Sequence, residues 1–155
     1  MNPKTDRPRH TLDPLALLAP TIVLTFALQW LLPLPFFLIL PSRIIGGILF
    51  AGGFSLGFPA LRSMLKANTT PNPHRPTTAL VFNGTYRITR NPMYLGMLIS
   101  YSGLFIFFQN PWFILFLPFL IWLFTNWVII PEEKYLEGKF GKEYLDFKAR
   151  VHRWI

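Results

Sequence analysis

Three long stretches without a charged residue dominate this sequence. They run over 14–42, 44–61 and 91–131 and contain 29, 18 and 41 residues. A transmembrane helix needs about 20 largely apolar residues to cross roughly 30 Å of hydrocarbon. Only 14% of all residues are charged, whereas an ordinary soluble domain has about a quarter. The pattern therefore predicts an integral membrane protein and excludes a soluble enzyme and a disordered tail.

The charge-free stretches divide into four predicted transmembrane helices, so the expected fold class is all-α. Asp13 suits an N-cap and Pro14 suits the first helical position. The last stretch is too long for one helix and divides at Gln109-Asn110-Pro111 into an antiparallel hairpin. We expect the four helices over 14–32, 43–66, 92–108 and 112–130. The chain is expected to form one domain, with two spans in 1–66 and a polar loop, the hairpin and a C-terminal helix in 67–155.

Small residues in the second and third predicted helices favour close helix packing. The second helix contains Gly53-x-x-x-Gly57, and the third contains Gly96, Ser100 and Gly103. Small side chains at such spacings let helix backbones approach closely in lipid. A phosphate-binding loop is the weaker interpretation of the glycines, because no Lys-Ser/Thr follows them and no βαβ unit can surround them.

The basic residues indicate the orientation in the membrane. With four crossings, both termini and the 67–90 loop lie on one side, and 14 of the 15 Lys and Arg residues lie there, leaving only Arg43 opposite. All seven acidic residues lie on that side as well. The positive-inside rule makes it the cytoplasmic side. We therefore expect a multi-pass membrane protein, in the inner membrane if bacterial, whose polar chemistry faces the cytoplasm.

Several other classes of site are disfavoured by composition. The chain has no cysteine, and its histidines, His10, His74 and His152, are scattered singly, so no metal site is predicted. The net charge of +8 reflects topology and contact with anionic lipid rather than nucleic acid in so apolar a chain. The expected partners are the lipid bilayer and a lipophilic ligand.

The unusual polar residues lie in two segments, 68–94 and 131–155. In the first, Asn83-Gly84 predicts a tight turn, and Asn91-Pro92 predicts an N-cap followed by proline at the first helical position. In the second, apolar residues recur every three or four positions, which predicts one amphipathic helix along the membrane surface. These apolar residues are Leu136, Phe140, Tyr144, Phe147 and Val151.

The acidic pair Glu132-Glu133 admits two interpretations. Acidic side chains after Pro131 stabilise the positive N-terminal end of a helix, and base rates favour this structural role. Alternatively, the pair emerges from the fourth helix where the polar loop can fold over it, and a carboxylate near a bilayer boundary needs a partner such as a cationic ligand.

Two blocks of the chain resemble a known family. The runs TTALVFNGTYRITRNPMYLG, over 77–96, and EEKYLEGKFGKEYLDFKARV, over 132–151, are separated by the predicted hairpin. Together they resemble the isoprenylcysteine carboxyl methyltransferase family, which is related to the phospholipid N-methyltransferases. The resemblance covers roughly residue 68 to the end. It implies a membrane methyltransferase that uses S-adenosylmethionine without a Rossmann domain, and a lipophilic acceptor that arrives from the bilayer.

The resemblance also implies which residues bind the cofactor, although it assigns no catalytic residue. The segment TALV matches the lining of the cofactor pocket, NPMY matches the family's His-Pro-x-Tyr element, and a tyrosine and a glutamate complete the set. The implied cofactor-binding residues are Thr78, Ala79, Leu80, Val81, Tyr86, Asn91, Pro92, Met93, Tyr94 and Glu132.

Two departures from the family pattern bear on the acceptor. Asn91 stands where the family usually has histidine, and an amide cannot act as a base. Val128 stands where the prenylcysteine enzymes have a substrate-contacting arginine. We therefore expect an acceptor that does not depend on a carboxylate clamp, such as an amine-headed lipid or a small amphiphile, entering between the third and fourth helices. The alternative function is a non-catalytic helical bundle that binds lipid or scaffolds a partner.

Overall fold

The structure is a computed structural model that describes residues 11–35, 41–72 and 75–155. Helices are the only regular elements within these ranges, which confirms the all-α prediction. They are α1 (Pro14–Leu31), α2 (Ser42–Lys66), a 3₁₀ turn (Gly84–Arg87), α3 (Pro92–Phe108), α4 (Trp112–Leu123), a π-helical segment (Phe124–Ile129), α5 (Ile130–Phe140) and α6 (Lys142–Arg150). The predicted cytoplasmic arm with Lys4, Arg7 and Arg9 lies outside the described residues, as do His10 and His74.

Three helices are long and apolar enough to cross a membrane, and α3 is a shorter apolar helix of 17 residues. The first is α1, whose start follows the predicted capping: the Asp13 carboxylate accepts a hydrogen bond from the Leu15 N–H at 2.8 Å, and Pro14 follows it. It ends at Leu31, one residue earlier than expected. The second is α2, and the third is the helix Trp112–Phe140, formed by α4, the π-helical segment and α5.

The predicted end of the fourth helix at Ile130 is wrong, because the helix continues to Phe140. Pro131 has no N–H to donate to the preceding turn, and the wider π-helical turns Phe124–Ile129 lie where that backbone bond is missing. Glu132 and Glu133 therefore lie inside a continuous helix rather than at a free N-terminus. The helix-start interpretation of the acidic pair does not hold.

The C-terminal stripe is not one amphipathic helix, contrary to the prediction. Gly141 adopts φ 54° and ψ −124°, a conformation that L side chains rarely adopt, and it separates α5 from α6. Tyr144 and Phe147 of α6 are buried against Tyr86 and Ala60. The break turns the second half of the stripe onto the protein rather than along a membrane surface.

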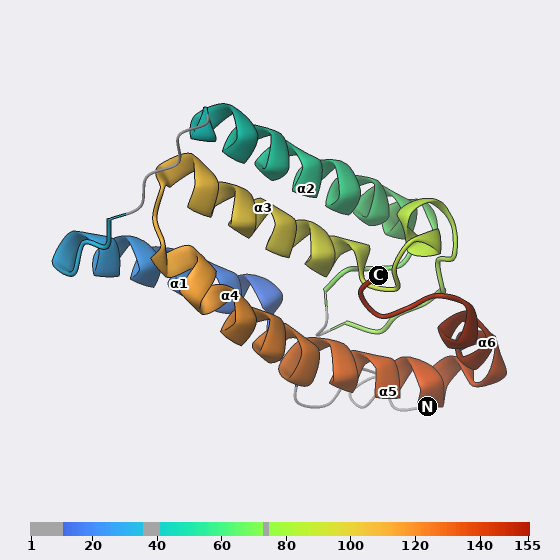
Figure 1. Cartoon of the computed structure of the whole chain (residues 1–155). Coiled ribbons are helices and arrows are strands. Elements are labelled where there is room, and N and C mark those ends of the chain that lie inside the picture. The colour runs from blue at the N-terminus through green and yellow to red at the C-terminus, as the bar shows by residue number, and fades with distance from the viewer. Residues whose placement is uncertain (1–10, 36–40, 73–74) are drawn as a thin grey trace.

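The helices α2 and α3 lie side by side over most of their length (Figure 1). A Cβ atom added at Gly53 would lie less than 3.0 Å from backbone atoms of α3, and one added at Gly96 or Gly103 would lie as close to α2. The Ser100 hydroxyl crosses the seam and donates to the Phe50 carbonyl at 3.1 Å. The predicted close packing by small residues is therefore present, and it joins these two helices to each other.

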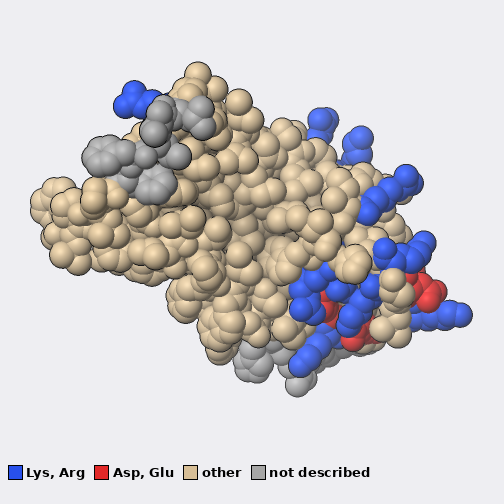
Figure 2. Space-filling model, viewed as in Figure 1, with Lys and Arg blue, Asp and Glu red and all other residues tan. Residues whose placement is uncertain are grey.

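On the face that Figure 2 shows, most charged side chains gather at one end of the molecule, and most of the remaining surface is uncharged. Arg43, in the first turn of α2, lies apart from the other described cations, which belong to residues 62–90 and 134–153. The helices thus separate an apolar body from one polar end, and that end holds the candidate site.

Candidate functional site

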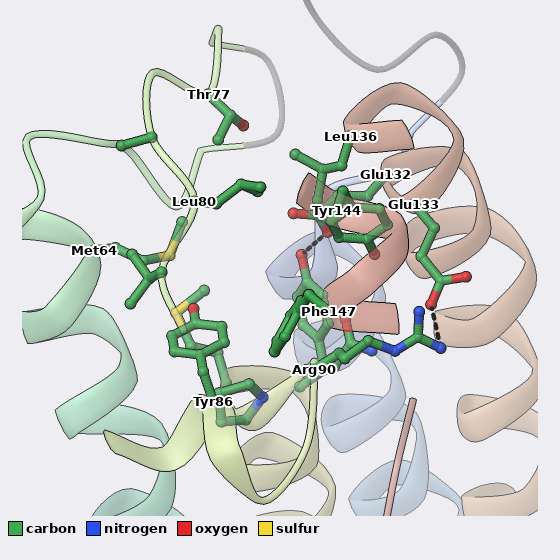
Figure 3. Close-up of a pocket in the computed structure, with 16 residues that line it drawn as sticks. Met64, Thr77, Leu80, Tyr86, Arg90, Glu132, Glu133, Leu136, Tyr144 and Phe147 are labelled. Carbon is green, nitrogen blue, oxygen red and sulfur yellow. Dashed lines mark hydrogen bonds and ion pairs between the residues drawn. The ribbon is translucent and has the colours of Figure 1, made fainter. Parts of the chain in front are cut away.

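A cavity opens at the polar end, between the 67–83 loop, the start of α3, and helices α5 and α6. It is partly open to solvent, and its walls are mainly apolar and aromatic side chains with a few polar groups among them, which is the composition of small-molecule sites. The loop residues Thr77 and Leu80 face Glu132, Leu136 and Tyr144 across it (Figure 3).

Nine of the ten residues that the family resemblance implied line this cavity. They are Ala79, Leu80, Val81, Tyr86, Asn91, Pro92, Met93, Tyr94 and Glu132. They come from three separate segments, so only the folded chain brings them together. Their role in cofactor binding stays a prediction.

The tenth residue, Thr78, has a different position, because it is absent from the cavity lining. Its hydroxyl donates to the Asn68 carbonyl at 2.7 Å, and its N–H donates to the Thr69 hydroxyl at 3.1 Å. The neighbouring Thr77 N–H donates to the Tyr135 hydroxyl on α5 at 3.2 Å. Thr78 thus closes the loop on itself, while Thr77 attaches the loop to α5 across the cavity.

The Glu132 carboxylate is half-buried and has an incomplete set of partners. The Tyr94 hydroxyl donates a hydrogen bond to Glu132 Oε2 at 2.8 Å. No Lys or Arg among the described residues forms an ion pair with it. A buried carboxylate is costly unless a cation or several donors compensate it. Glu132 is therefore positioned to accept a cationic group of a ligand in the cavity.

Glu133, unlike Glu132, forms ion pairs with two arginine side chains. Arg153 binds it through two hydrogen bonds, from Nε to Oε1 at 3.0 Å and from Nη2 to Oε2 at 2.7 Å. Arg90 Nη2 lies 3.2 Å from Glu133 Oε1. The side chains of Arg90 and Glu133 are only 7% and 6% exposed. Two adjacent carboxylates on one helix thus have separate roles, one facing the ligand space and one tying the tail to the start of α3.

The C-terminal segment after α6 folds back onto the residues that precede α3. The Arg90 N–H donates to the His152 carbonyl at 3.0 Å. The Thr89 hydroxyl and the Asn91 amide both donate to the Arg153 carbonyl at 2.9 Å. Asn91 is the N-cap residue of α3 and Pro92 follows it, as predicted, but the Asn91 side chain makes no capping hydrogen bond. Its amide holds the tail against the cavity instead.

Two tyrosines of the cavity stay in their neutral form. Burial raises the pKa of Tyr86 above its ordinary value, and the charge of Glu132 raises it further. Burial likewise raises the pKa of Tyr144, the charges of Glu133 and Glu132 add to this, and Arg90 opposes it. Both hydroxyls remain protonated at neutral pH and can donate hydrogen bonds.

Seven further lining residues were not among the implied set. They are Met64, Thr77, Arg90, Glu133, Leu136, Tyr144 and Phe147. The stripe in the tail contained a signal for three of them, since Leu136, Tyr144 and Phe147 belong to it. The tail helix was expected to lie along the membrane and help close the pocket, with this stripe buried against lipid or another helix. Glu133 belongs to the acidic pair singled out in the sequence, but its ion pairs with Arg90 and Arg153 depend on the tail folding back and had no local signal.

An apolar groove adjoins the cavity. Residues of α1, α2 and α3 line it, and Met93 lines both the groove and the cavity. No residue of α4 lines the groove, so it does not lie between the third and fourth helices, where we expected acceptor entry. Val128 is fully buried in the core beside Tyr94 and Phe124 and lines neither space.

The chain is similar in sequence to a known family and to several known proteins. The phospholipid methyltransferase family profile matches residues 41–143. A probable protein-S-isoprenylcysteine O-methyltransferase of Oryza sativa subsp. indica is 34% identical over 73 residues, 47% of this chain and 38% of that protein. Protein-S-isoprenylcysteine O-methyltransferase B of Arabidopsis thaliana is 36% identical over 72 residues, 46% of this chain and 36% of that protein.

The protein-S-isoprenylcysteine O-methyltransferase of Saccharomyces cerevisiae is also 36% identical over 72 residues, 46% of this chain and 30% of that protein. These matches thus span only 30% to 38% of the relatives' own length. No solved structure gives a significant match to the chain.

Proposed function

The chain belongs to the phospholipid methyltransferase family, and from this premise we propose that it transfers a methyl group from S-adenosylmethionine to a lipophilic or small amphiphilic acceptor. The observation that carries the proposal is the position of Glu132. Its half-buried carboxylate has a hydrogen bond from Tyr94 but no described cationic partner, and it lines a cavity walled by aromatic and aliphatic side chains. A ligand with a cationic group and an aromatic ring fits these surroundings.

The residues of the cavity suit this cofactor. When bound, S-adenosylmethionine supplies a methyl group on a positively charged sulfur. Glu132 would hold the ammonium group, and the rings of Tyr86 and Tyr94 would face positive charge with about 1 kcal/mol of cation–π stabilisation or more when desolvated. Leu80 and Val81, on the loop, offer an apolar surface to a purine.

The protein's contribution to the reaction is alignment and exclusion of water. Methyl transfer from a sulfonium is an in-line displacement, which gains most from fixed geometry. Tyr144 and Phe147 of α6 wall the cavity, and Asn91 and Thr89 hold the tail beside it. Asn91 cannot remove a proton. The acceptor is therefore a carboxylate or an amine that is already neutral, which burial near lipid favours.

The acceptor would reach the cavity sideways, along the groove between α1, α2 and α3. The groove is apolar, and Met93 lines both the groove and the cavity, so an apolar chain lying in the groove would end beside the polar site. The position of Val128 in the core leaves no cation there to clamp a carboxylate. We propose an amine-headed lipid or another small amphiphile as acceptor, and a site that faces the cytoplasm.

Calorimetry on the detergent-purified protein tests the cofactor. S-adenosylmethionine and its demethylated product should bind, and Glu132→Ala and Tyr94→Ala should each weaken binding about tenfold or more. The first removes the carboxylate that would hold the ammonium group, and the second removes the hydroxyl that donates to that carboxylate. The matched control is Glu137→Ala, since Glu137 lies on the same helix and does not line the cavity. Absence of binding to the wild-type protein would leave the non-catalytic bundle as the better explanation.

Methyl-transfer assays in reconstituted bilayers test the acceptor. Amine-headed lipids should be methylated. If a farnesylated cysteine is turned over efficiently and amidation of its carboxylate abolishes turnover, then the acceptor does depend on a carboxylate clamp and this part of the proposal is wrong.

A further inference from the structure

The apolar groove leads into the cavity along two helices. On α3, Met93 lines both spaces, and on α2 the groove-lining Leu61 lies about one turn before the cavity-lining Met64. From this junction the groove extends as far as Phe50 and Leu104. Its lining therefore continues the cavity into the apolar body of the molecule.

The length of the groove suits a long apolar chain. Its lining along α3 runs from Met93 to Leu104, which is about 16 Å of helix and about half of the hydrocarbon thickness of a bilayer. Phe54 and Phe58 of α2 line it and are each more than half exposed, so the groove opens at the side of the helices. A chain that follows the groove from the cavity thus has the length of one membrane leaflet.

Glycines line part of the groove, and helix packing accounts for Gly53 and Gly96. A Cβ atom at either of these would lie less than 3.0 Å from backbone atoms of the facing helix. A Cβ atom at Gly57 would make only ordinary contacts, the nearest at 3.8 Å from the Cα and the carbonyl oxygen of Met93. A side chain at Gly57 is thus compatible with the α2–α3 seam, and it would extend beside Met93, where the groove joins the cavity.

We propose that Gly57 determines the specificity for the methyl acceptor. Because Gly57 has no side chain, a long apolar chain can lie in the groove with its head group beside the cavity, and a larger residue closes this route. Each methylene buried in the groove strengthens binding about fourfold, so the groove selects long-chain amphiphiles over short ones. This inference rests on the proposed function and narrows the class of acceptor that it allows.

Photolabelling of the full chain in detergent tests the inference with a defined probe. The probe is dodecylamine with a diazirine next to the amine, added with saturating S-adenosylhomocysteine so that the cofactor site is filled. In the wild type, unlabelled dodecylamine should compete away the labelling of Met93 and its neighbours. Butylamine at the same concentration should compete about tenfold less well or worse, because it buries fewer methylenes. Equal competition by the two amines overturns the inference.

A larger residue at the junction assigns the effect to Gly57. Gly57→Leu should reduce the competed labelling about tenfold, as expected when about two methylenes lose apolar contact. Gly52→Leu is the matched control, because Gly52 lies on the same helix, lines neither space and has nothing within 4 Å of an added Cβ. It should be labelled as the wild type is. Equal labelling of the two variants contradicts the role of Gly57.

Gly57→Ala covers the case in which Gly57→Leu does not fold, since its one added carbon makes only ordinary contacts. It should reduce the competed labelling by a smaller factor, about two to four relative to Gly52→Ala. Labelling that does not differ between these alanine variants also overturns the inference.

Calorimetry separates failure of this inference from failure of the proposed function. S-adenosylhomocysteine should bind the wild type and Gly57→Leu with the same affinity, because Gly57 does not line the cavity. Wild-type binding together with unchanged labelling in Gly57→Leu overturns the inference alone. Weaker binding in Gly57→Leu than in Gly52→Leu overturns it too, since Gly57 would then act on the cofactor site. Absence of binding to the wild type contradicts the proposed function itself.

Discussion

The α2–α3 seam and the polar end of the molecule are held together in opposite ways. At the seam, Gly53 lies against Gly96 and Gly46 against Gly103, and the backbones approach closely because none of these four residues has a side chain. At the polar end, Glu133 joins Arg90 to Arg153, so that α5, the start of α3 and the tail meet through long charged side chains.

The difference follows from the solvent that each region faces. Within a bilayer there is no hydrophobic drive to bring helices together, so close van der Waals contact between smooth surfaces must do it. At the membrane boundary, charges are tolerated and can be paired. We therefore expect the protein to lose stability when side chains are enlarged at the seam, and when charged or hydrogen-bonding groups are removed at the polar end.

The largest effect is expected from Glu133→Ala. Removal of this carboxylate leaves Arg90, whose side chain is 7% exposed, without its ionic partner. Breaking a buried pair in this way costs about 3–5 kcal/mol. Thermal unfolding in detergent, followed by tryptophan fluorescence, measures the loss. Glu137→Ala is the control, because its pair with Lys148 is 30% and 39% exposed and should contribute less than about 1 kcal/mol. Equal losses in the two variants would contradict the assigned role of Glu133.

The seam is tested by adding one carbon atom. Gly53→Ala places a Cβ less than 3.0 Å from the Gly96 carbonyl and the Ser100 backbone, and overpacking of this kind costs about 1–3 kcal/mol. At the adjacent Gly52 nothing lies within 4 Å of an added Cβ, so Gly52→Ala should be neutral or gain up to about 1 kcal/mol from helix propensity. The same unfolding assay measures both, and a Gly53→Ala variant as stable as Gly52→Ala would show that the seam is not tight.

A smaller effect is expected where the tail is attached by hydrogen bonds. The buried Thr89 hydroxyl donates to the Arg153 carbonyl and accepts from the Asn91 N–H. Thr89→Val keeps the shape and loses both bonds, at a cost of about 1–2 kcal/mol. In Thr125→Val, the lost bond is a local one to the Ile121 carbonyl, and stability should change less. Hydrogen exchange of the tail amides should rise in Thr89→Val alone; unchanged protection would show that the tail is held by other contacts.

The smallest effect is a pH dependence confined to the polar end. Burial raises the pKa of Tyr144 in the folded protein above its unfolded value near 10. Its contribution to stability is therefore fully present below pH 10 and falls as the pH rises above 10, because the unfolded chain releases the proton first. At pH 10.5 the loss is below about 1 kcal/mol. The free energy of unfolding should therefore decline less between pH 9 and 10.5 in Tyr144→Phe than in the wild type. Thermal unfolding measured over this pH range tests this, and an equally steep decline in the two proteins would contradict the role of Tyr144.

Much of the helical framework was predictable because lipid constrains sequence so strongly. Unsatisfied backbone groups are costly in hydrocarbon, so charge-free runs of sufficient length must be helical. The bounds of α3 and the start of α1 agree with their predictions for local reasons, namely proline at the first turn and the Asp13 carboxylate. Gly53 and Gly96 were visible as packing residues, although their pairing with each other was not.

The sequence-based predictions failed where a residue that suits a local role is instead used in a contact between segments remote in sequence. Asn91 has the composition of an N-cap, yet its amide reaches the carbonyl of Arg153, which lies 62 positions later. Gly141 interrupts a regular stripe, since its backbone conformation lets α6 fold onto Tyr86. In both cases the contact that decides the structure is remote in sequence, and no window of neighbouring residues contains it.

The sequence by itself determined that this chain is an all-helical protein of the phospholipid methyltransferase family, with its charges at one end and most of its cavity residues in two recognisable blocks. Only the tertiary structure decided which of two adjacent carboxylates is left for a ligand. Glu132 and Glu133 have the same chemistry and neighbouring positions, but the folded tail brings Arg153 to Glu133, where Arg90 also lies, and leaves Glu132 with Tyr94. The reason is geometric: successive residues on a helix point about 100° apart, so remote segments packed on different faces give identical side chains different partners.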